Sequence, residues 1–482
     1  MGDARFAVVG HPNKGKSSIV ATLAADAGVA VAPEPGTTTR SRAYPMRVDG
    51  RTLYTLIDTP GFQRARRAYA WLQEHDEGVE RRPGVVRKFI AAHERGDAYP
   101  DEVELLRPLM DREHPAGVLY VVDGSVPYGP EYEAEMQVLR WTGRPSLALI
   151  NPIGPADHTE AWRTALGQYF RIVRVFDAVD AAFDKRLELL RAFGQLDEAW
   201  RGPLDEAVAE LEADRGRRRR EAAAELASLV VGSLTLSVTQ KLEPNADPKA
   251  AQPALLERFK GELRRKERRA RDRVESIYDH RGVERQEAEA SALDEDLFSE
   301  ETWLAFGLTR RQLLLAGAGG GAAAGGALDV AAGGTSLLMG AAIGAVVGGA
   351  AAWWGSGRLA EFKVLSTPLG DARLGGRLLR CGPTKNPNFP FVLLGRARLH
   401  HAVVAGRTHA TRGALVVPEH GVGQGVSAGP LRPLADDRRK VLAQAFRAAG
   451  RAGGDAEAAA SAQVALTDLI DATLAEDTAG AS

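Results

Sequence analysis

The sequence predicts an α/β fold, in which a mostly parallel sheet has flanking helices, followed by a mainly α-helical C-terminal region. In the first part, short apolar runs alternate with charged, helix-forming segments. The apolar runs lie at residues 6–9, 53–57, 117–122, 146–150 and 172–176. Strands of a parallel sheet that are buried on both faces have this continuous apolar character. From about residue 200 the strands give way to long, Ala-rich, charged stretches, which indicate helices.

Length and composition indicate more than one domain. The chain has 482 residues, of which 44 % are apolar, enough for at least two hydrophobic cores. We therefore divide the chain into four parts. These are an α/β domain at residues 1–198 with a helical insertion at about 63–114, charged long helices at 199–309, an apolar Gly/Ala-rich hairpin at 310–358, and a helical region at 359–482.

Residues 10–17 read Gly-His-Pro-Asn-Lys-Gly-Lys-Ser, between the first apolar run and a helix-forming stretch. In such a loop Gly10 and Gly15 let the backbone approach phosphates closely, so that successive N–H groups point at the oxygens. Lys16 reaches the β- and γ-phosphates, and the Ser17 hydroxyl ligates Mg²⁺. The motif predicts a P-loop that binds a nucleoside triphosphate through Gly10, Asn13, Lys14, Gly15, Lys16, Ser17 and Ser18.

Residues 58–61, Asp-Thr-Pro-Gly, follow directly on the apolar run that ends at residue 57. Their position predicts that Asp58 holds Mg²⁺ through water and that the Gly61 N–H senses the γ-phosphate, as in switch GTPases. Loss of that phosphate releases the loop and converts hydrolysis into movement. The Thr-rich segment 35–40 lies between the two motifs and offers a further Mg²⁺ ligand, for which Thr38 and Thr39 both stay open.

On these three motifs the chain resembles the bacterial Era- and TrmE-like P-loop GTPases of the translation-factor class, over about residues 4–195. As a whole it looks like a bacterial family that joins such a domain to a long C-terminal region of unassigned function. The resemblance implies that Asn13 helps to hold K⁺ beside the phosphates, where the cation supplies the charge that an arginine finger gives elsewhere. It also implies slow, cation-assisted GTP hydrolysis with Lys16, Asn13 and Gly61 as catalytic residues. Phe62 stands where Ras-like enzymes carry a water-orienting Gln, and Gln63 is one position late.

The base-reading motif departs from the family pattern. Residues 151–154 read Asn-Pro-Ile-Gly where the pattern is Asn-Lys-x-Asp, so that only Asn151 matches. The Asp of the pattern accepts hydrogen bonds from guanine, and its loss relaxes guanine selectivity. Asp157 could substitute as the acceptor, or it could cap the helix that begins near Thr159. The last base-contact loop falls at residues 177–178, which read Asp-Ala in place of the usual Ser-Ala.

Two further features bear on partners. The insertion contains helix-forming segments at 63–74 and 85–94, and it is either an effector surface that moves with the nucleotide state or a helical layer on the sheet edge. Long helices are expected at 204–242 and 249–289, with basic runs at 217–220 and 264–273. Such runs with interleaved acids are usually solvated faces with paired charges, and anionic lipid headgroups or RNA phosphates are the alternatives.

The hairpin predicted at 310–358 has two readings. Residues 330–354 carry no charge, and as a helix they would span about 37 Å, compared with roughly 30 Å for a bilayer core. Small residues recur every fourth position and two tryptophans close the segment, namely Gly340, Gly344, Gly348, Trp353 and Trp354. Close helix packing and headgroup contact both use such residues. Membrane insertion and a buried intramolecular hairpin both stay open, because the segment is mostly Ala and Gly.

The remaining sequence gives information on the cellular compartment and shows no second catalytic or metal-binding motif. The tail is expected to form helices at 391–408, 436–449 and 456–474, and the adjacent His400 and His401 lack an acid or Cys at ligand spacing. The single cysteine, Cys381, excludes an intramolecular disulfide and suits a reducing compartment. The first strand begins without a secretory leader, so we expect a cytoplasmic protein, with the inner face of the membrane as a further location.

Together these features predict a GTP-binding protein that hydrolyses GTP to GDP and phosphate with Mg²⁺, and with K⁺ by resemblance. It would act as a switch coupled to a helical, membrane-associated effector region. Two alternatives stay open: a membrane-associated scaffold that binds nucleotide without turnover, and an ATP-using variant allowed by the altered base loop. An anionic membrane surface is one expected partner, RNA or the ribosome is compatible with the domain, and the sequence identifies no protein partner.

Overall fold

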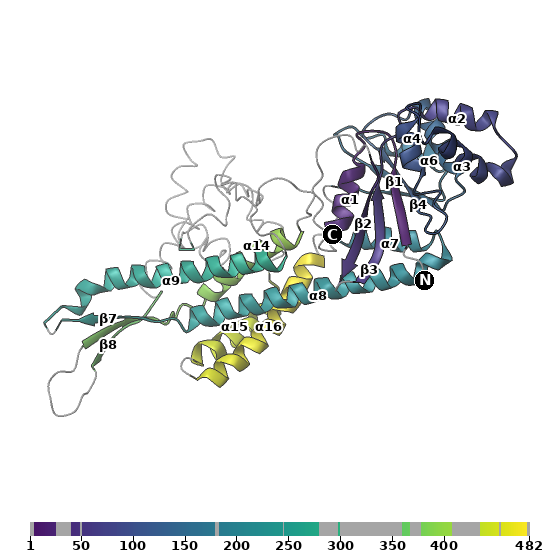
Figure 1. The fold of residues 1–482 in the computed structure, drawn as a ribbon. Helices are drawn as coiled ribbons and strands as arrows, with labels where there is room; N and C mark the ends of the chain where they lie inside the picture. Colours follow the sequence, from purple (N-terminus) through teal and green to yellow (C-terminus); the bar gives the residue numbers. More distant parts are fainter. Residues whose placement is uncertain are drawn as a thin grey trace, which may run out of the picture. The chain divides into compact units, whose positions relative to one another are not determined.

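The computed structural model describes residues 4–25, 40–48, 51–178, 183–243, 245–278, 297–298, 359–366, 377–406, 434–452 and 455–479. These residues form two compact units, one reaching to Arg215 and the other beginning at Gly216 (Figure 1). Both points lie within one helix, α8 (Glu198–Leu234). The hairpin expected at 310–358 lies outside the described residues.

The first unit contains a six-stranded sheet in the order β2-β3-β1-β4-β5-β6. All neighbouring strands are parallel except β2 and β3, which are antiparallel. The strands are β1 (Ala4–Val9), β2 (Arg42–Val48), β3 (Arg51–Asp58), β4 (Gly117–Asp123), β5 (Ser146–Asn151) and β6 (Ile172–Val175). The α/β fold with a mostly parallel sheet is therefore confirmed.

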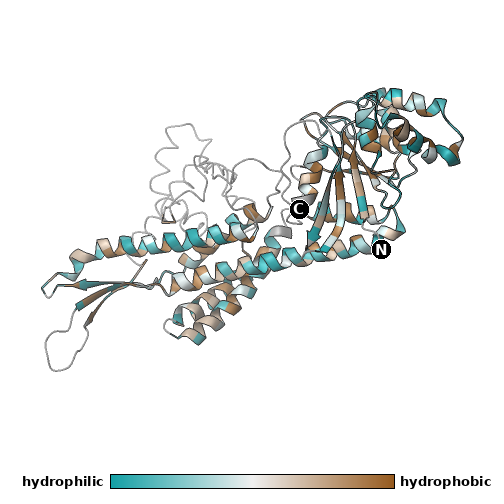
Figure 2. Cartoon of the chain, in the orientation of Figure 1, coloured by the Kyte–Doolittle hydropathy of each residue, from teal (hydrophilic) through white to brown (hydrophobic). Residues whose placement is uncertain are grey.

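Helices cover both faces of this sheet, because successive side chains of a strand point to opposite faces. Along β1, Ala7 and Val9 pack into one apolar cluster, while Phe6 and Val8 pack into the other. The first face is covered by α2 (Ala65–Glu74), α3 (Arg82–His93), α4 (Pro100–Leu106), α5 (Pro130–Trp141) and α6 (Thr159–Leu166). The second is covered by α1 (Lys16–Ala25), α7 (Phe183–Gly194) and the first part of α8. Figure 2 shows apolar residues concentrated along the strands between these layers.

The insertion lies on the first face of the sheet. The helices expected at 63–74 and 85–94 are confirmed as α2 and α3, with the short 3₁₀ turn η1 (Val79–Arg81) between them. Helix α4 was not predicted, because its seven residues are too few to show a helical period. Its Val103, Leu105 and Leu106 are buried in the same core as α2 and α3.

The second unit is mainly helical, as predicted, and also holds a small antiparallel sheet of order β7-β9-β8. Its elements are the second part of α8, β7 (Val238–Leu242), α9 (Pro248–Ile277), β8 (Phe362–Ser366), β9 (Arg377–Cys381), α14 (Phe389–Gly406), α15 (Asp436–Arg451) and α16 (Ala456–Ala479). The expectation of a helix up to residue 242 was wrong beyond Leu234. Residues 238–242 pair with β9 instead, a partner more than a hundred positions away that the local pattern does not reveal.

Ion pairs hold the helices of the second unit together. From α8, Arg219 and Arg220 each lie 2.7 Å from an aspartate of α16, Asp471 and Asp468 respectively. Arg273 of the second basic run lies 3.2 Å from Glu221 of α8. These contacts favour the prediction that the basic runs are faces with paired charges. Within the described ranges, no helix combines the length and the apolarity that a membrane span requires.

Asp477 forms a buried ion pair in this unit, whereas the adjacent residue Glu476 forms an exposed one. The two acids therefore allow a matched test. Arg398 of α14 donates two hydrogen bonds to Asp477 of α16, at 2.9 Å from Nε and 2.5 Å from Nη2, whereas Glu476 pairs with Arg438 at the exposed surface. We expect Asp477→Ala to lower the free energy of unfolding by about 3–5 kcal/mol, because it leaves a buried guanidinium without this counter-charge. Glu476→Ala should cost less than about 1 kcal/mol. Urea unfolding followed by circular dichroism measures both, and equal midpoints would contradict the assignment.

Candidate functional site

The P-loop runs from the end of β1 to the first turn of α1, and Gly10 lies against the backbone of β4 whereas Gly15 lies against the side chain of Asn151. A Cβ on Gly10 would lie 2.3 Å from the carbonyl oxygen of Val121, and one on Gly15 would lie 2.3 Å from Nδ2 of Asn151. Gly15 has φ +78° and Asn13 has φ +60°, in the left-handed region that glycine and asparagine tolerate. The predicted loop geometry is therefore set by steric contact with β4 and β5. Ser18 lies in the first turn of α1.

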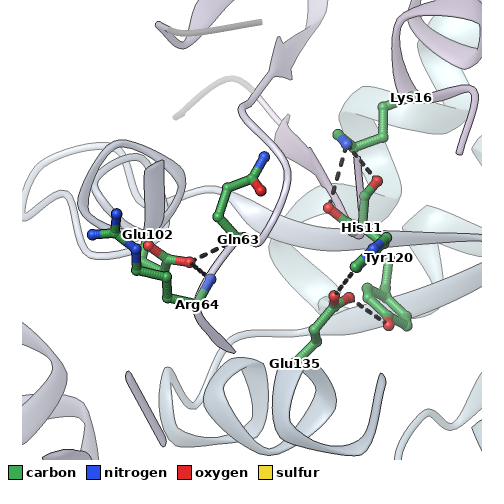
Figure 3. Close-up of polar contacts among 8 residues, drawn as sticks. His11, Lys16, Gln63, Arg64, Glu102, Tyr120 and Glu135 are labelled. Atoms are coloured by element: carbon green, nitrogen blue, oxygen red, sulfur yellow. Dashed lines mark hydrogen bonds and ion pairs between the residues drawn. The ribbon is translucent and has the colours of Figure 1, made fainter. Parts of the chain in front are cut away.

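Lys16 lies inside the loop. Its Nζ donates hydrogen bonds to the carbonyl oxygens of His11, at 2.8 Å, and Gly10, at 3.3 Å (Figure 3). Burial lowers the pKa of Lys16 to about 8, although the charges of Asp58 and Glu135 oppose part of this shift. A desolvated ammonium has lost much of its hydration, so contact with phosphate oxygens restores a stabilising anionic environment.

The two Mg²⁺ ligands predicted from different motifs are brought together. The Ser17 hydroxyl donates a 2.8 Å hydrogen bond to Oδ2 of Asp58, from the end of β3. Hydroxyl and carboxylate oxygens are the hard donors that Mg²⁺ accepts, with water and phosphates completing its octahedron, so the pair fits this ion. No group of three or more His, Cys, Asp and Glu in the described part of the chain could hold a metal by itself. Thr38 and Thr39 lie outside the described residues.

The predicted γ-phosphate sensor packs directly on the P-loop. A Cβ on Gly61 would lie 2.6 Å from the backbone nitrogen of Pro12, so this close approach requires glycine. The N–H of Phe62 donates to the carbonyl oxygen of Gly10 at 3.2 Å. The Phe62 side chain is buried in the apolar core, where a water-orienting residue cannot lie. Gln63 lies at the start of the segment that leads into α2.

On the base side, Asn151 joins two loops. Its Nδ2 donates to the carbonyl oxygen of Lys14 at 3.4 Å, and its Oδ1 accepts the N–H of Ala178 at 3.2 Å. The structure thus brings Asn151, the P-loop and the predicted final base-contact loop together. Asp157 is fully exposed and accepts the N–H of Thr159 at 2.9 Å, which supports its alternative role as a cap of α6.

Asp123, the last residue of β4, forms a second link. Its Oδ2 lies 3.5 Å from Nζ of Lys14, and its Oδ1 accepts the N–H and the hydroxyl of Ser125. Burial raises the pKa of Asp123, but the hydrogen bonds from Ser125 and the charge of Lys14 outweigh it, so that the net pKa is lowered. Asp123 therefore stays ionised and holds Lys14 at the edge of the base side.

A buried carboxylate, that of Glu135, lies against His11 of the P-loop. Oε1 of Glu135, on α5, lies 2.8 Å from Nδ1 of His11, and its Oε2 accepts the hydroxyl of Tyr120 at 2.9 Å (Figure 3). Burial raises the pKa of Glu135, although His11, Tyr120 and Lys16 oppose the shift, and burial also raises the pKa of Tyr120 well above its usual range. The contact between His11 and Glu135 positions the backbone of His11, whose carbonyl oxygen Lys16 contacts. Sequence reasoning missed Glu135, whose one signal is an acid among the core-facing residues of α5.

The histidines of the tail lie apart from this chemistry. In the second unit, Nε2 of His400 lies 3.0 Å from Glu275, and Nε2 of His401 lies 2.9 Å from the hydroxyl of Tyr278. Both imidazoles are buried between α14 and α9. These contacts give the two side chains a structural role in the packing of the helices.

Comparison with known proteins identifies two regions. Residues 163–470 match the family described as "Domain of unknown function (DUF3482)", and residues 5–151 match the family described as "50S ribosome-binding GTPase". The chain is 41 % identical to GTPase Der of Methylococcus capsulatus over 90 residues, which are 19 % of this chain and 18 % of that protein. It is 27 % identical to GTPase Der of Bifidobacterium longum over 200 residues, 40 % of this chain and 36 % of that protein. The chain thus spans well under half the length of these relatives.

A solved structure of Aquifex aeolicus Era bound to GDP.AlF4⁻ covers 58 % of this chain and 90 % of its own, at 16 % identity and a TM-score of 0.25. Era in complex with MgGDPNP and 16S ribosomal RNA gives a TM-score of 0.26 at 17 % identity. Likenesses this weak carry no argument, so the classification rests on the sequence matches and on the site geometry. The chain belongs to the family defined by the domain of unknown function DUF3482, and its N-terminal residues 5–151 match the family described as "50S ribosome-binding GTPase".

Proposed function

We propose that the first unit binds GTP with Mg²⁺, hydrolyses it to GDP and phosphate, and acts as a switch for the helical second unit. The observation that carries the proposal is the convergence of two motifs, the P-loop at residues 10–17 and the Asp-Thr-Pro-Gly segment at residues 58–61. Lys16 is desolvated inside the P-loop, Ser17 and Asp58 pair at its end, and Gly61 packs on Pro12. The similarity to relatives named GTPase Der, together with the GTPase family match over residues 5–151, supports guanine as the base.

Each residue has a defined part in the proposed reaction. Lys16 and the loop N–H groups neutralise charge on the β- and γ-phosphates, and bound Mg²⁺ supplies electrostatic stabilisation of the charge that develops on the transferred group. Ser17 and Asp58 would hold this ion, with Thr38 or Thr39 as a further ligand. The N–H of Gly61 binds the γ-phosphate and is released when it leaves. Asn13, exposed at the turn of the loop, would hold K⁺ beside the phosphates.

Guanine selectivity in this proposal rests on Asn151 with Lys14 and the loop at 177–178. The family pattern Asn-Lys-x-Asp has a Lys directly after the Asn, and this chain has Pro152 there. Lys14 of the P-loop lies beside Asp123, and its carbonyl oxygen accepts a hydrogen bond from Asn151. Its methylene stem can cover a base face while Asp123 fixes its ammonium. Asp157 stays a candidate acceptor for the base only if it leaves its contact with Thr159.

Turnover of GTP and ATP in K⁺ and in Na⁺ tests the proposal. We expect GTP to be hydrolysed faster in K⁺, and this cation effect to disappear in Asn13→Ala. Lys16→Ala should weaken nucleotide binding by about ten- to a hundredfold, since a charge-assisted contact is worth about 1.5–3 kcal/mol. Lys88→Ala, on the surface of α3, is the matched control and should bind normally. Tight binding without turnover would favour the scaffold alternative, and preference for ATP would favour the ATP-using variant.

The pKa of Lys16 predicts a pH dependence of nucleotide affinity. Phosphates bind the protonated ammonium, and the free protein loses that proton as the pH rises through about 8. Affinity should therefore be level below this pH and fall above it, by up to about tenfold per pH unit. Calorimetry should show proton uptake on binding at alkaline pH. Lys16→Arg keeps its charge there, so its affinity should stay level; an equal decline in that variant would assign the effect to another group.

We further propose that residues 310–358 associate with a membrane. The charge-free segment 330–354 with its terminal tryptophans supports it, while the paired arginines of α8 and α9 give less support to lipid or RNA contact by the basic runs. We expect the full chain to float with anionic lipid vesicles and to resist carbonate extraction. Deletion of residues 313–354 should leave a folded protein in the soluble fraction. Complete release of the full chain by carbonate would remove insertion from the proposal.

A further inference from the structure

Helix α4 of the insertion supplies a carboxylate to the start of α2. Oε1 of Glu102 accepts the N–H of Gln63 at 2.9 Å and that of Arg64 at 2.5 Å (Figure 3). Arg64 is the N-cap residue of α2, and its own side chain makes no capping hydrogen bond. The first N–H groups of a helix have no intrahelical partner and carry partial positive charge. Glu102 therefore accepts the N–H of the N-cap residue of α2 and of the residue before it, from a distant part of the chain.

The capped segment follows directly on the predicted phosphate sensor. Gln63 and Arg64 come two and three residues after Gly61, so a displacement of the sensor displaces their N–H groups. The guanidinium of Arg64 also donates to the carbonyl oxygen of Asp97, at 3.1 Å, in the segment before α4. The start of α2 is thus attached to the insertion by its backbone and by its side chain.

The same short helix also contacts Ser41, which follows the Thr-rich segment predicted to respond to the nucleotide. Oε1 of Glu104 accepts the N–H of Ser41 at 3.0 Å, and the carbonyl oxygen of Glu104 accepts the Ser41 hydroxyl at 2.9 Å. Ser41 comes two and three positions after Thr39 and Thr38, the candidate Mg²⁺ ligands, and directly before β2. Two carboxylates, two residues apart on α4, therefore contact the segments that follow both predicted switch motifs.

Burial makes the Glu102 contact hard to break without moving α4. The residue has no exposed surface, and its Oε2 has no hydrogen-bond partner among the described residues. Withdrawal of Gln63 and Arg64 would leave the whole carboxyl group buried and without these donors, which is among the costliest changes in a folded protein. When the start of α2 moves, either α4 moves with it or the carboxyl group of Glu102 becomes hydrated.

We propose that α4 reads both switch segments, with Glu102 and Glu104 as the positioning residues that transmit the nucleotide state to the insertion. The inference deepens the proposed function and rests on it. It gives the insertion the role of a responding surface, the first of the two readings that the sequence left open. The other reading, a static layer on the sheet edge, requires no contact between α4 and the switch segments.

Hydrogen–deuterium exchange of the full chain, bound to GDP or to a non-hydrolysable GTP analogue, tests the inference. We expect the backbone amides of residues 99–107 to exchange at different rates in the two states. This difference should be lost in Glu102→Ala and reduced in Glu104→Ala. Glu102→Gln keeps an amide oxygen that can accept the same two N–H groups, so the difference should return in that variant. Glu94→Gln, which removes a surface carboxylate paired with Arg107 at 3.2 Å, is the control and should respond like the wild type.

The outcomes separate this inference from the proposed function. Nucleotide affinity is measured for every variant, and we expect it to stay close to that of the wild type, because Glu102 and Glu104 do not line the P-loop. Equal exchange of residues 99–107 in both nucleotide states of the wild type overturns the inference, even if GTP binds and turns over normally. A wild-type response in Glu102→Ala also overturns it. A chain that binds no nucleotide at all overturns the proposed function first, and the coupling with it.

Discussion

The first unit depends on the close approach of the P-loop backbone to the ends of neighbouring strands. Gly10 lies against Val121 of β4, Gly15 against Asn151 of β5, and Gly61 against Pro12 of the loop itself. Backbone packing this close leaves no space for a single added methyl group at any of these positions. It brings the P-loop, Asp58 as proposed Mg²⁺ ligand and Asn151 as proposed base contact to one edge of a mostly parallel sheet, where ligands of such folds bind.

Buried charge is the second organising feature of the site. Lys16 and Glu135 are both shielded from water, and each is held by hydrogen bonds to loop backbone or to another side chain. Buried ionisable groups are tolerated only when such partners exist. The side chains that need these partners are also the ones that order the loops, so the site is organised before a ligand arrives.

The second unit uses charge differently. Its helices are joined by ion pairs between residues far apart in the chain, some exposed, such as Arg220 with Asp468, and some buried, such as Arg396 with Glu267 at 2.7 Å. Three arginines of the basic runs thus have acidic partners on neighbouring helices, as expected for faces with paired charges, namely Arg219, Arg220 and Arg273. Exposed pairs add little stability singly, whereas a buried pair constrains which helix faces can meet.

The sequence by itself determined the elements that local rules control. The glycines and Lys16 of the P-loop, the Asp-Thr-Pro-Gly segment, the apolar strands and most helices follow from backbone geometry and hydrophobic period, which neighbouring residues encode. The same rules revealed the degenerate base motif, because a missing acceptor is visible without a structure.

Only the tertiary structure decided which distant residues meet. Lys14 and Asp123 are 109 positions apart, and His11 and Glu135 are 124 positions apart, so neither contact leaves a periodic signal. For the same reason the local sequence of β7 predicts the continuation of a helix, whereas the residues pair with β9. Glu102 and Glu104 belong to no motif in the sequence. Their contacts with Gln63, Arg64 and Ser41 exist because the sheet places α4 beside both loops, and that placement is a property of the whole fold.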